Sequence, residues 1–203
     1  GDRDRLEQQL QIIKQQGYPN YFGEQRFGHQ GRNVAKALAL FNGARFKPEQ
    51  RSIYLSAARS YLFNLIVAER VRQQNWNQGL AGEVLQLANT HSYFASDAMD
   101  ATLKTRIESA DLHPTAVLWG KGLNTSSSDV LQIEQAVIAA HQDIADGLVA
   151  AGLELDRRAM RVMTEDLVWQ FEDQQTLTVS FRLPAGSYAT GLLRELVTVS
   201  ESV

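Results

Sequence analysis

A long apolar segment in the first half of the chain restricts the possible folds most strongly. Between Gln50 and Gln74 the sequence reads QRSIYLSAARSYLFNLIVAERVRQQ, and Pro48 stands just before it. Apolar residues recur at near-helical spacing on one side, and the opposite positions Leu55, Leu62 and Ile66 are apolar as well. A helix that is apolar nearly all round is buried on several sides. We therefore expect this segment to be the central helix of the chain.

Other helices and several short strands are expected around this central helix. Helical patterns cover residues 4–16, 32–41, 99–109 and 128–151, and a further helix starts in AGSYATGLLRELVTV. Ser128 and Ser187 are the expected N-caps of the last two of these helices. Acidic side chains on the helix over 128–151, such as Glu134 and Asp143, are expected to be solvated. Strand patterns occur in EVLQLAN, in AVLWG, and in EDLVWQF and TLTVSFRL, which a polar turn joins into a hairpin. This order predicts an α+β fold.

Composition excludes several classes of protein. The chain has no cysteine, which excludes disulfides, Cys-ligated zinc and thiol catalysis and suits a reducing compartment. Its N-terminal stretch, GDRDRLEQQL, is charged and lacks the apolar core of a signal peptide. No run approaches the roughly 18 apolar residues that a membrane span needs. We therefore expect a cytoplasmic protein without a membrane partner.

Motifs of common enzyme chemistry are missing from the sequence. It contains neither a Walker A loop nor a G-x-G-x-x-G fingerprint. Its four histidines, His29, His91, His113 and His141, lie far apart, so no metal site is expected. Ser187 follows Gly186 in AGSYA, which is not the G-x-S-x-G of a nucleophile elbow. Composition and spacing alone therefore indicate no enzyme.

Positive charge is concentrated in one part of the chain. Between Asn20 and Arg72 the sequence has nine Lys or Arg and three acidic residues, a surplus of six positive charges in a chain of net charge −3. A basic region inside an acidic chain favours a phosphate-bearing partner. The alternative is that these side chains are solvated and pair with acids elsewhere.

The stretch NYFGEQRFG, residues 20–28, carries chemical groups suited to unstacked nucleotides. Aromatic faces beside arginine and amide side chains hold bases and the backbone between them. Tyr21, Phe22 and Phe27 are candidate stacking surfaces for bases. Arg26 and the nearby Arg32 are candidates to bind phosphates, and Asn20 or Gln25 could bind a base edge.

An alternative reading gives the same stretch a structural role. The aromatics Phe22 and Phe27 would plug a hydrophobic seam, and Arg26 would pair with Glu24. The residues alone do not decide between the two interpretations.

NYFGEQRFG also resembles the signature of the TruD family of tRNA pseudouridine synthases. Three further segments are similar to family blocks in the same order: SAARSYLFN (56–64), LQLA with YFAS (85–96), and LPAGSYATGLLREL (183–196). The resemblance covers nearly the whole chain, and its first and last motifs are specific.

The resemblance implies an isomerase that converts uridine 13 of tRNA to pseudouridine without a metal or organic cofactor. In this family an aspartate in a G-x-K-D-x-x-A-x-T motif acts on a nucleotide flipped out of its stack. No lysine of this chain is followed by aspartate, and the family's G-N-x-F segment is also absent. We therefore expect the C-terminal part of such an enzyme, inactive alone, whose partners are tRNA and the missing N-terminal catalytic part.

The family's architecture implies a division of the chain and a set of site residues. Residues 1–14 would be a helical lead-in, 15–163 the mostly helical inserted TRUD domain with short strands, and 164–203 a hairpin and helix of the catalytic sheet. The expected RNA-binding residues are Asn20, Arg26, Arg32, Arg59 and Asn64. Ser187 and Tyr188 would lie near the active site, although a serine at such a junction is by default only a cap.

Two other functions remain open at this point. One is an RNA-binding module without catalysis, which the basic region suggests. The other is a helical protein-interaction domain with no role toward RNA.

Overall fold

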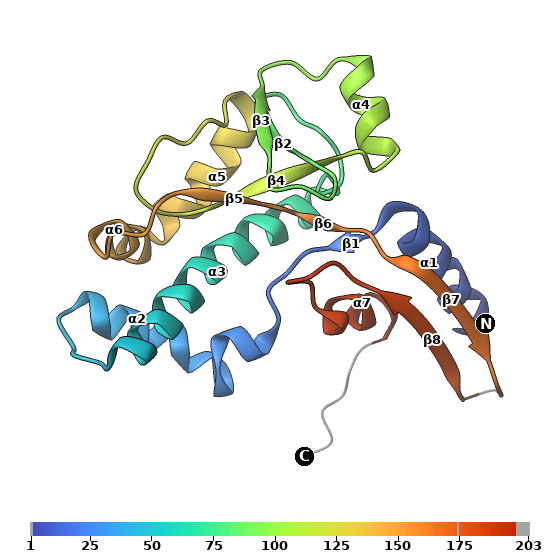
Figure 1. Ribbon diagram of the computed structural model, residues 1–203, viewed down its shortest axis with the longest axis horizontal. Coiled ribbons are helices and arrows are strands. Elements are labelled where there is room, and N and C mark those ends of the chain that lie inside the picture. Colours follow the sequence, from blue (N-terminus) through green and yellow to red (C-terminus); the bar gives the residue numbers. More distant parts are fainter. Residues whose placement is uncertain (1, 174, 198–203) are drawn as a thin grey trace.

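Helix α3 (Pro48–Arg72) runs through the middle of the molecule in the computed structural model, which describes residues 2–173 and 175–197 (Figure 1). On one side Leu55 and Leu62 pack against helices α2 (Arg32–Phe41) and α6 (Gln142–Ala150). On another side Phe63 and Ile66 pack against strand β4 (Leu112–Leu118). The expected central helix is therefore confirmed.

One side of α3 is less buried than its apolar pattern suggests. Ile53 is 52% exposed, and Ala68 is exposed as well. Leu65, on the same side, is half-buried and lines a surface groove together with Ala68. Leu65 and Ala68 thus face a groove rather than the core.

A four-stranded antiparallel sheet covers the other side of α3, with strand order β3-β2-β4-β5. Its remaining strands are β2 (Glu83–Leu87), β3 (Tyr93–Ser96) and β5 (Asp156–Ala159). Helix α4 (Ala101–Glu108) packs against β4, and α5 (Ser128–Ala140) packs against α3. The two strands expected in EVLQLAN and AVLWG are confirmed, whereas β3 and β5 were not predicted.

A second core joins the two ends of the chain. Helix α1 (Asp2–Gln16), the β7–β8 hairpin (Glu165–Phe171 and Leu177–Arg182) and α7 (Ala189–Leu196) pack around Leu10, Ile13 and Leu192 (Figure 1). Strands β1 (Tyr18–Pro19) and β6 (Arg161–Val162) pair between this core and the sheet. The predicted hairpin is confirmed, and the division at residues 14 and 163 stays a prediction.

Three expectations about helix ends were wrong. The helix expected over 128–151 is interrupted at His141, whose backbone leaves the helical region (φ −134°, ψ 42°), so that α5 and α6 are separate. This break lets Ile138 and Leu148 reach the same core cluster against α3. Ser127, not Ser128, precedes the first turn of α5, and Tyr188, not Ser187, precedes α7.

Candidate nucleic-acid interface

The segment over residues 20–31 is anchored at Asn20 and Gly23, which are buried, while Glu24, Gln25 and residues 29–31 are exposed. Two short 3-10 helices, η1 (Glu24–Phe27) and η2 (His29–Gly31), lead from β1 into α2. At Gly23 the backbone passes so close to Tyr188 that a Cβ atom would lie 2.9 Å from its ring. The backbone at Gly23 is therefore packed directly against Tyr188, the residue that precedes α7.

Phe22 lies at the centre of the segment, and α3 fixes its position. The Asn64 side-chain amide donates to the Phe22 carbonyl at 3.0 Å, and its oxygen accepts from the Phe22 N–H at 2.9 Å. The Phe22 ring makes edge-to-face contacts with Phe63 at 5.4 Å and Tyr188 at 6.3 Å between ring centres. The amide of Asn64 is used in this contact, so Asn64 positions Phe22.

Two guanidinium groups lie over the same ring. The guanidinium carbon of Arg26 is 5.4 Å from the centre of Phe22, and that of Arg158 is 4.3 Å from it. Such contacts are favourable because the face of an aromatic ring carries negative potential. We call Phe22, Arg26, Arg158 and Tyr188 the Phe22 cluster.

Arg26 is held by hydroxyl groups and not by a carboxylate. Its Nη1 donates to Ser56 Oγ at 2.8 Å, and its Nη2 donates to Tyr188 Oη at 3.2 Å. Glu24 instead forms an ion pair with Arg194 on α7. The alternative in which Arg26 pairs with Glu24 was therefore wrong.

Sequence reasoning missed Arg158, the other arginine of the cluster. Its Nη2 donates to Asn20 Oδ1 at 2.7 Å and to the Gly186 carbonyl at 2.9 Å. Asn20 is only 7% exposed, and its amide donates to the Ala159 carbonyl at 2.8 Å. Burial lowers the pKa of the Arg158 guanidinium; Tyr188 acts in the opposite direction, and the positive charge of Arg26 lowers the pKa further. Asn20 therefore orients Arg158.

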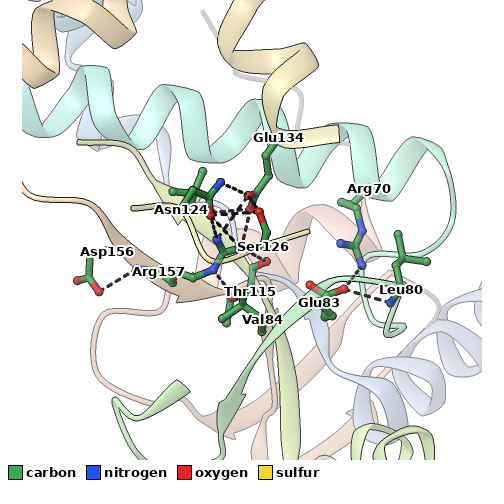
Figure 2. A network of polar contacts seen from close by, with 11 residues as sticks. Arg70, Leu80, Glu83, Val84, Thr115, Asn124, Ser126, Glu134, Asp156 and Arg157 are labelled. Atoms are coloured by element: carbon green, nitrogen blue, oxygen red, sulfur yellow. Dashed lines mark hydrogen bonds and ion pairs between the residues drawn. The ribbon is translucent and has the colours of Figure 1, made fainter. Parts of the chain in front are cut away.

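A buried polar network fixes the strand that carries Arg158 (Figure 2). The neighbouring Arg157 points into the protein, where it forms an ion pair with Glu134 and donates to Thr115 Oγ1 at 2.7 Å. Glu134 also accepts from Asn124 Nδ2 at 2.8 Å and from Ser126 Oγ at 2.7 Å. The expectation that Glu134 is solvated was wrong, because it is the buried counter-ion of Arg157.

Alternation along β5 connects this network to the Phe22 cluster. Successive side chains of a strand point to opposite faces. With Arg157 fixed inside, Arg158 is directed toward Asn20 and Phe22. Two adjacent arginines in a short strand could have signalled this arrangement, had β5 been recognised.

The remaining expected site residues lie apart from the cluster or at its edge. Arg32 is exposed and donates to Gln30, two residues away. Arg59 donates to the carbonyls of Leu118 and Glu154, and burial lowers its pKa, so it connects α3 to the sheet. Ser187 is half-buried beside Tyr188. The structure therefore brings together Asn20, Arg26, Asn64 and Tyr188, with Ser187 adjoining them.

Two grooves adjoin the cluster. The larger, of about 1120 Å³, runs between the 20–31 segment and α3 and is lined by aromatic and amide side chains. The smaller, of about 260 Å³, lies between this segment and α7. Both share Tyr21, Glu24, Phe27 and Asn64. We call the two grooves together the hollow; Phe22 lines its smaller part, whereas Arg26, Arg158 and Tyr188 line neither groove.

Two titratable side chains in these grooves carry shifted pKa values. Burial, with a contribution from Glu195, raises the pKa of Tyr21 to about 12. Burial also raises the pKa of Glu195, which forms no hydrogen bond or ion pair in the part of the chain that the structure describes. The hollow therefore contains a carboxylate that is poorly solvated and has no partner.

Residues 2–173 and 175–197 offer neither a cluster of metal ligands nor a membrane-spanning helix. They contain no group of three or more His, Cys, Asp or Glu side chains able to hold a metal ion. No helix among them has both the length and the hydropathy of a membrane span.

Taken together, these features define an α+β protein in which two arginines and an aromatic ring meet beside two surface grooves. The family model described as tRNA pseudouridine synthase D (TruD) matches residues 29–196, which begin directly after NYFGEQRFG. The tRNA pseudouridine synthase D of Hydrogenovibrio crunogenus is 49% identical, over 98% of this chain and 58% of that protein. The enzyme of the same name from Aeromonas salmonicida is 46% identical, over 98% of this chain and 56% of its own length. The chain belongs to the TruD family of tRNA pseudouridine synthases.

A solved structure shows the same fold. The crystal structure assigned to tRNA pseudouridine synthase D (TruD) from Methanosarcina mazei superposes with a TM-score of 0.73, covering 96% of this chain and 64% of that one, at 18% identity. The chain spans a little over half the length of the curated relatives it matches.

Proposed function

We propose that this chain is the tRNA-handling part of a tRNA pseudouridine synthase that isomerises uridine 13. Its role is to bind and position the tRNA. The Phe22 cluster carries this proposal, because a fixed aromatic ring beside two guanidiniums and two grooves can receive an unstacked nucleotide. Membership in the TruD family supports the choice of tRNA over other RNA.

We propose that the group that performs chemistry on the base, a catalytic aspartate, is not part of this chain. Pseudouridine formation moves the glycosidic bond from N1 to C5 of the uracil, and the nucleotide must first leave its stack. In the family this step depends on an aspartate that follows a lysine, and no lysine here is followed by aspartate. We therefore propose that the chain is inactive alone and acts with an N-terminal catalytic part in the cytoplasm, without metal or cofactor.

Binding of an unmodified tRNA transcript tests this function. The affinity should be measurable at low salt and should fall steeply as salt rises, because bound phosphates release counterions. The absence of detectable binding at low salt would refute the proposal. Duplex DNA of equal length serves as the comparison and should bind more weakly.

An RNA-binding module without catalysis is the second candidate, since the same cluster supports it. The two candidates differ in what happens when an N-terminal catalytic part is added. A part of a synthase gains pseudouridine formation, whereas a module without catalysis only binds.

A further inference from the structure

Two cations of the Phe22 cluster have no counter-ion. Within residues 2–173 and 175–197, neither Arg26 nor Arg158 forms an ion pair, and each is partly buried. Their acceptors are hydroxyl, amide and carbonyl oxygens, all of them neutral. Charges removed from water are normally paired, because desolvation of an unpaired ion is costly.

Other buried arginines of this chain show the usual solution. Arg70 is paired with Glu83 at 2.9 Å, and Arg157 is paired with Glu134. Arg161 is held by His113 and two carbonyl groups, but it is a single guanidinium. The Phe22 cluster differs because two guanidiniums lie over one ring and repel each other.

The groups around the two arginines are arranged to donate hydrogen bonds. Tyr188 Oη accepts from Arg26, which leaves its own proton free to donate. Arg158 uses Nη2 for both of its hydrogen bonds, so its Nη1 forms none; its Nε also has no partner, but that atom is buried. Tyr188 also precedes the first turn of α7, whose N-terminal N–H groups add partial positive charge. Several donors with two full positive charges form an oxyanion site.

We propose that Arg26, Arg158 and the Tyr188 hydroxyl bind one backbone phosphate of the RNA, next to the nucleotide that Phe22 receives. This inference rests on the proposed function and adds the contact that fixes the position of the strand. A phosphate is favoured over a protein carboxylate because the larger adjoining groove, of about 1120 Å³, has room for nucleotides and presents aromatic and amide side chains beside Glu24. The surplus of positive charge between Asn20 and Arg72 favours it as well.

Substitution of Arg26 tests the site in the full 203-residue chain. Arg26→Gln should weaken binding of an unmodified tRNA transcript about tenfold and reduce the slope of log K against log[salt] by about 1. Arg106→Gln is the matched control, because Arg106 lies on α4 and is paired with Asp111 at 2.6 Å. The control should leave both the affinity and the slope unchanged.

Arg158→Gln should have the same effect as Arg26→Gln. Because Arg158 also holds Asn20 in place, Arg158→Lys is measured as well. The lysine retains the charge and should restore most of the salt slope. Circular dichroism and the Tm show that each variant is folded.

Inorganic phosphate and acetate distinguish the two kinds of anion. At equal ionic strength phosphate should raise the Tm of the wild-type chain more than acetate does, and Arg26→Gln should abolish the difference. If acetate protects as well as phosphate and the tRNA salt slope of Arg26→Gln equals that of wild type, the site holds a carboxylate and the phosphate proposal is overturned.

The same data separate this inference from the proposed function. If wild-type chain binds tRNA and Arg26→Gln binds with an unchanged slope, the phosphate site is wrong while the function stands. If wild-type chain does not bind tRNA at all, the proposed function fails, and the RNA phosphate site fails with it.

Discussion

Replacing Glu134 with glutamine should destabilise this protein severely. Glu134 is 1% exposed, and the side chain of Arg157 beside it is fully buried. The amide keeps the shape of the carboxylate but removes its charge and presents N–H groups where Arg157, Asn124 and Ser126 already donate. Arg157 then becomes an uncompensated buried cation, which costs about 3–5 kcal/mol.

That cost is a large part of the total stability. A domain is stable by about 5–15 kcal/mol. For a chain of this size each kcal/mol corresponds to about 2–4 °C, so the Tm should fall by about 6–20 °C. The measurement is urea unfolding followed by circular dichroism, and Glu108→Gln on exposed α4 is the matched control, with a change within about 0.5 kcal/mol.

A double-mutant cycle separates the pair from its surroundings. Arg157→Met removes the cation, so the combination with Glu134→Gln should cost at least about 1.5 kcal/mol less than the sum of the two single changes. The reasoning is refuted if Glu134→Gln alone costs less than about 1 kcal/mol, or if the two costs simply add. Because β5 carries both Arg157 and Arg158, the destabilised variant should also bind tRNA more weakly.

Further predictions concern pH and the 20–31 segment. Burial and Arg161 lower the pKa of His113 to about 4, so below pH 6.5 the unfolded chain binds more protons than the folded one. The free energy of unfolding should therefore fall as the pH is lowered from 6.5 to 4. His113→Gln should flatten this part of the profile of urea midpoint against pH. Burial raises the pKa of Glu195, so its charged form opposes folding; Glu195→Gln should raise the Tm at pH 7, with no difference from wild type at pH 3.5. Gly23→Ala would place a Cβ 2.9 Å from the Tyr188 ring, which should lower the free energy of unfolding in urea by about 1–3 kcal/mol. The same change should weaken tRNA binding. An unchanged urea midpoint would contradict the packing described.

Elements with a strong apolar pattern were predictable from the sequence. Helix α2 has the expected bounds, and α3 begins at the expected proline. In the β7–β8 hairpin, Leu177, Val179 and Phe181 alternate with exposed residues, as the pattern indicated. Here the local period of apolar residues and the tertiary burial agree, so one reading of the sequence suffices.

Features that depend on polar burial were not predictable in the same way. Strand β5 reads DRRA and shows no apolar alternation that would mark it as a strand. Its two arginines are accommodated by tertiary contacts: Arg157 pairs with Glu134 from a helix distant in sequence, and Arg158 stacks on Phe22. Glu134 itself occupies a helix position that resembles solvated surface in sequence. Such partners come from segments far apart in the chain, and a local pattern carries no information about them.

The candidate site was therefore only half predictable. Asn20, Arg26 and Tyr188 come from recognisable motifs, whereas Arg158 comes from the missed strand. The break at His141 escaped prediction because the apolar period continues across it, and only packing against α3 explains the turn.

Pseudouridine formation at uridine 13 tests the central claim most directly. An unmodified tRNA transcript with tritium at C5 of its uridines is incubated with the chain alone, with an N-terminal catalytic part from a TruD relative, and with both. We predict no tritium release from either part alone and clear release from the mixture, reduced when the chain carries Arg26→Gln. Turnover by the 203-residue chain alone, or none from the mixture of two folded parts, would contradict the account.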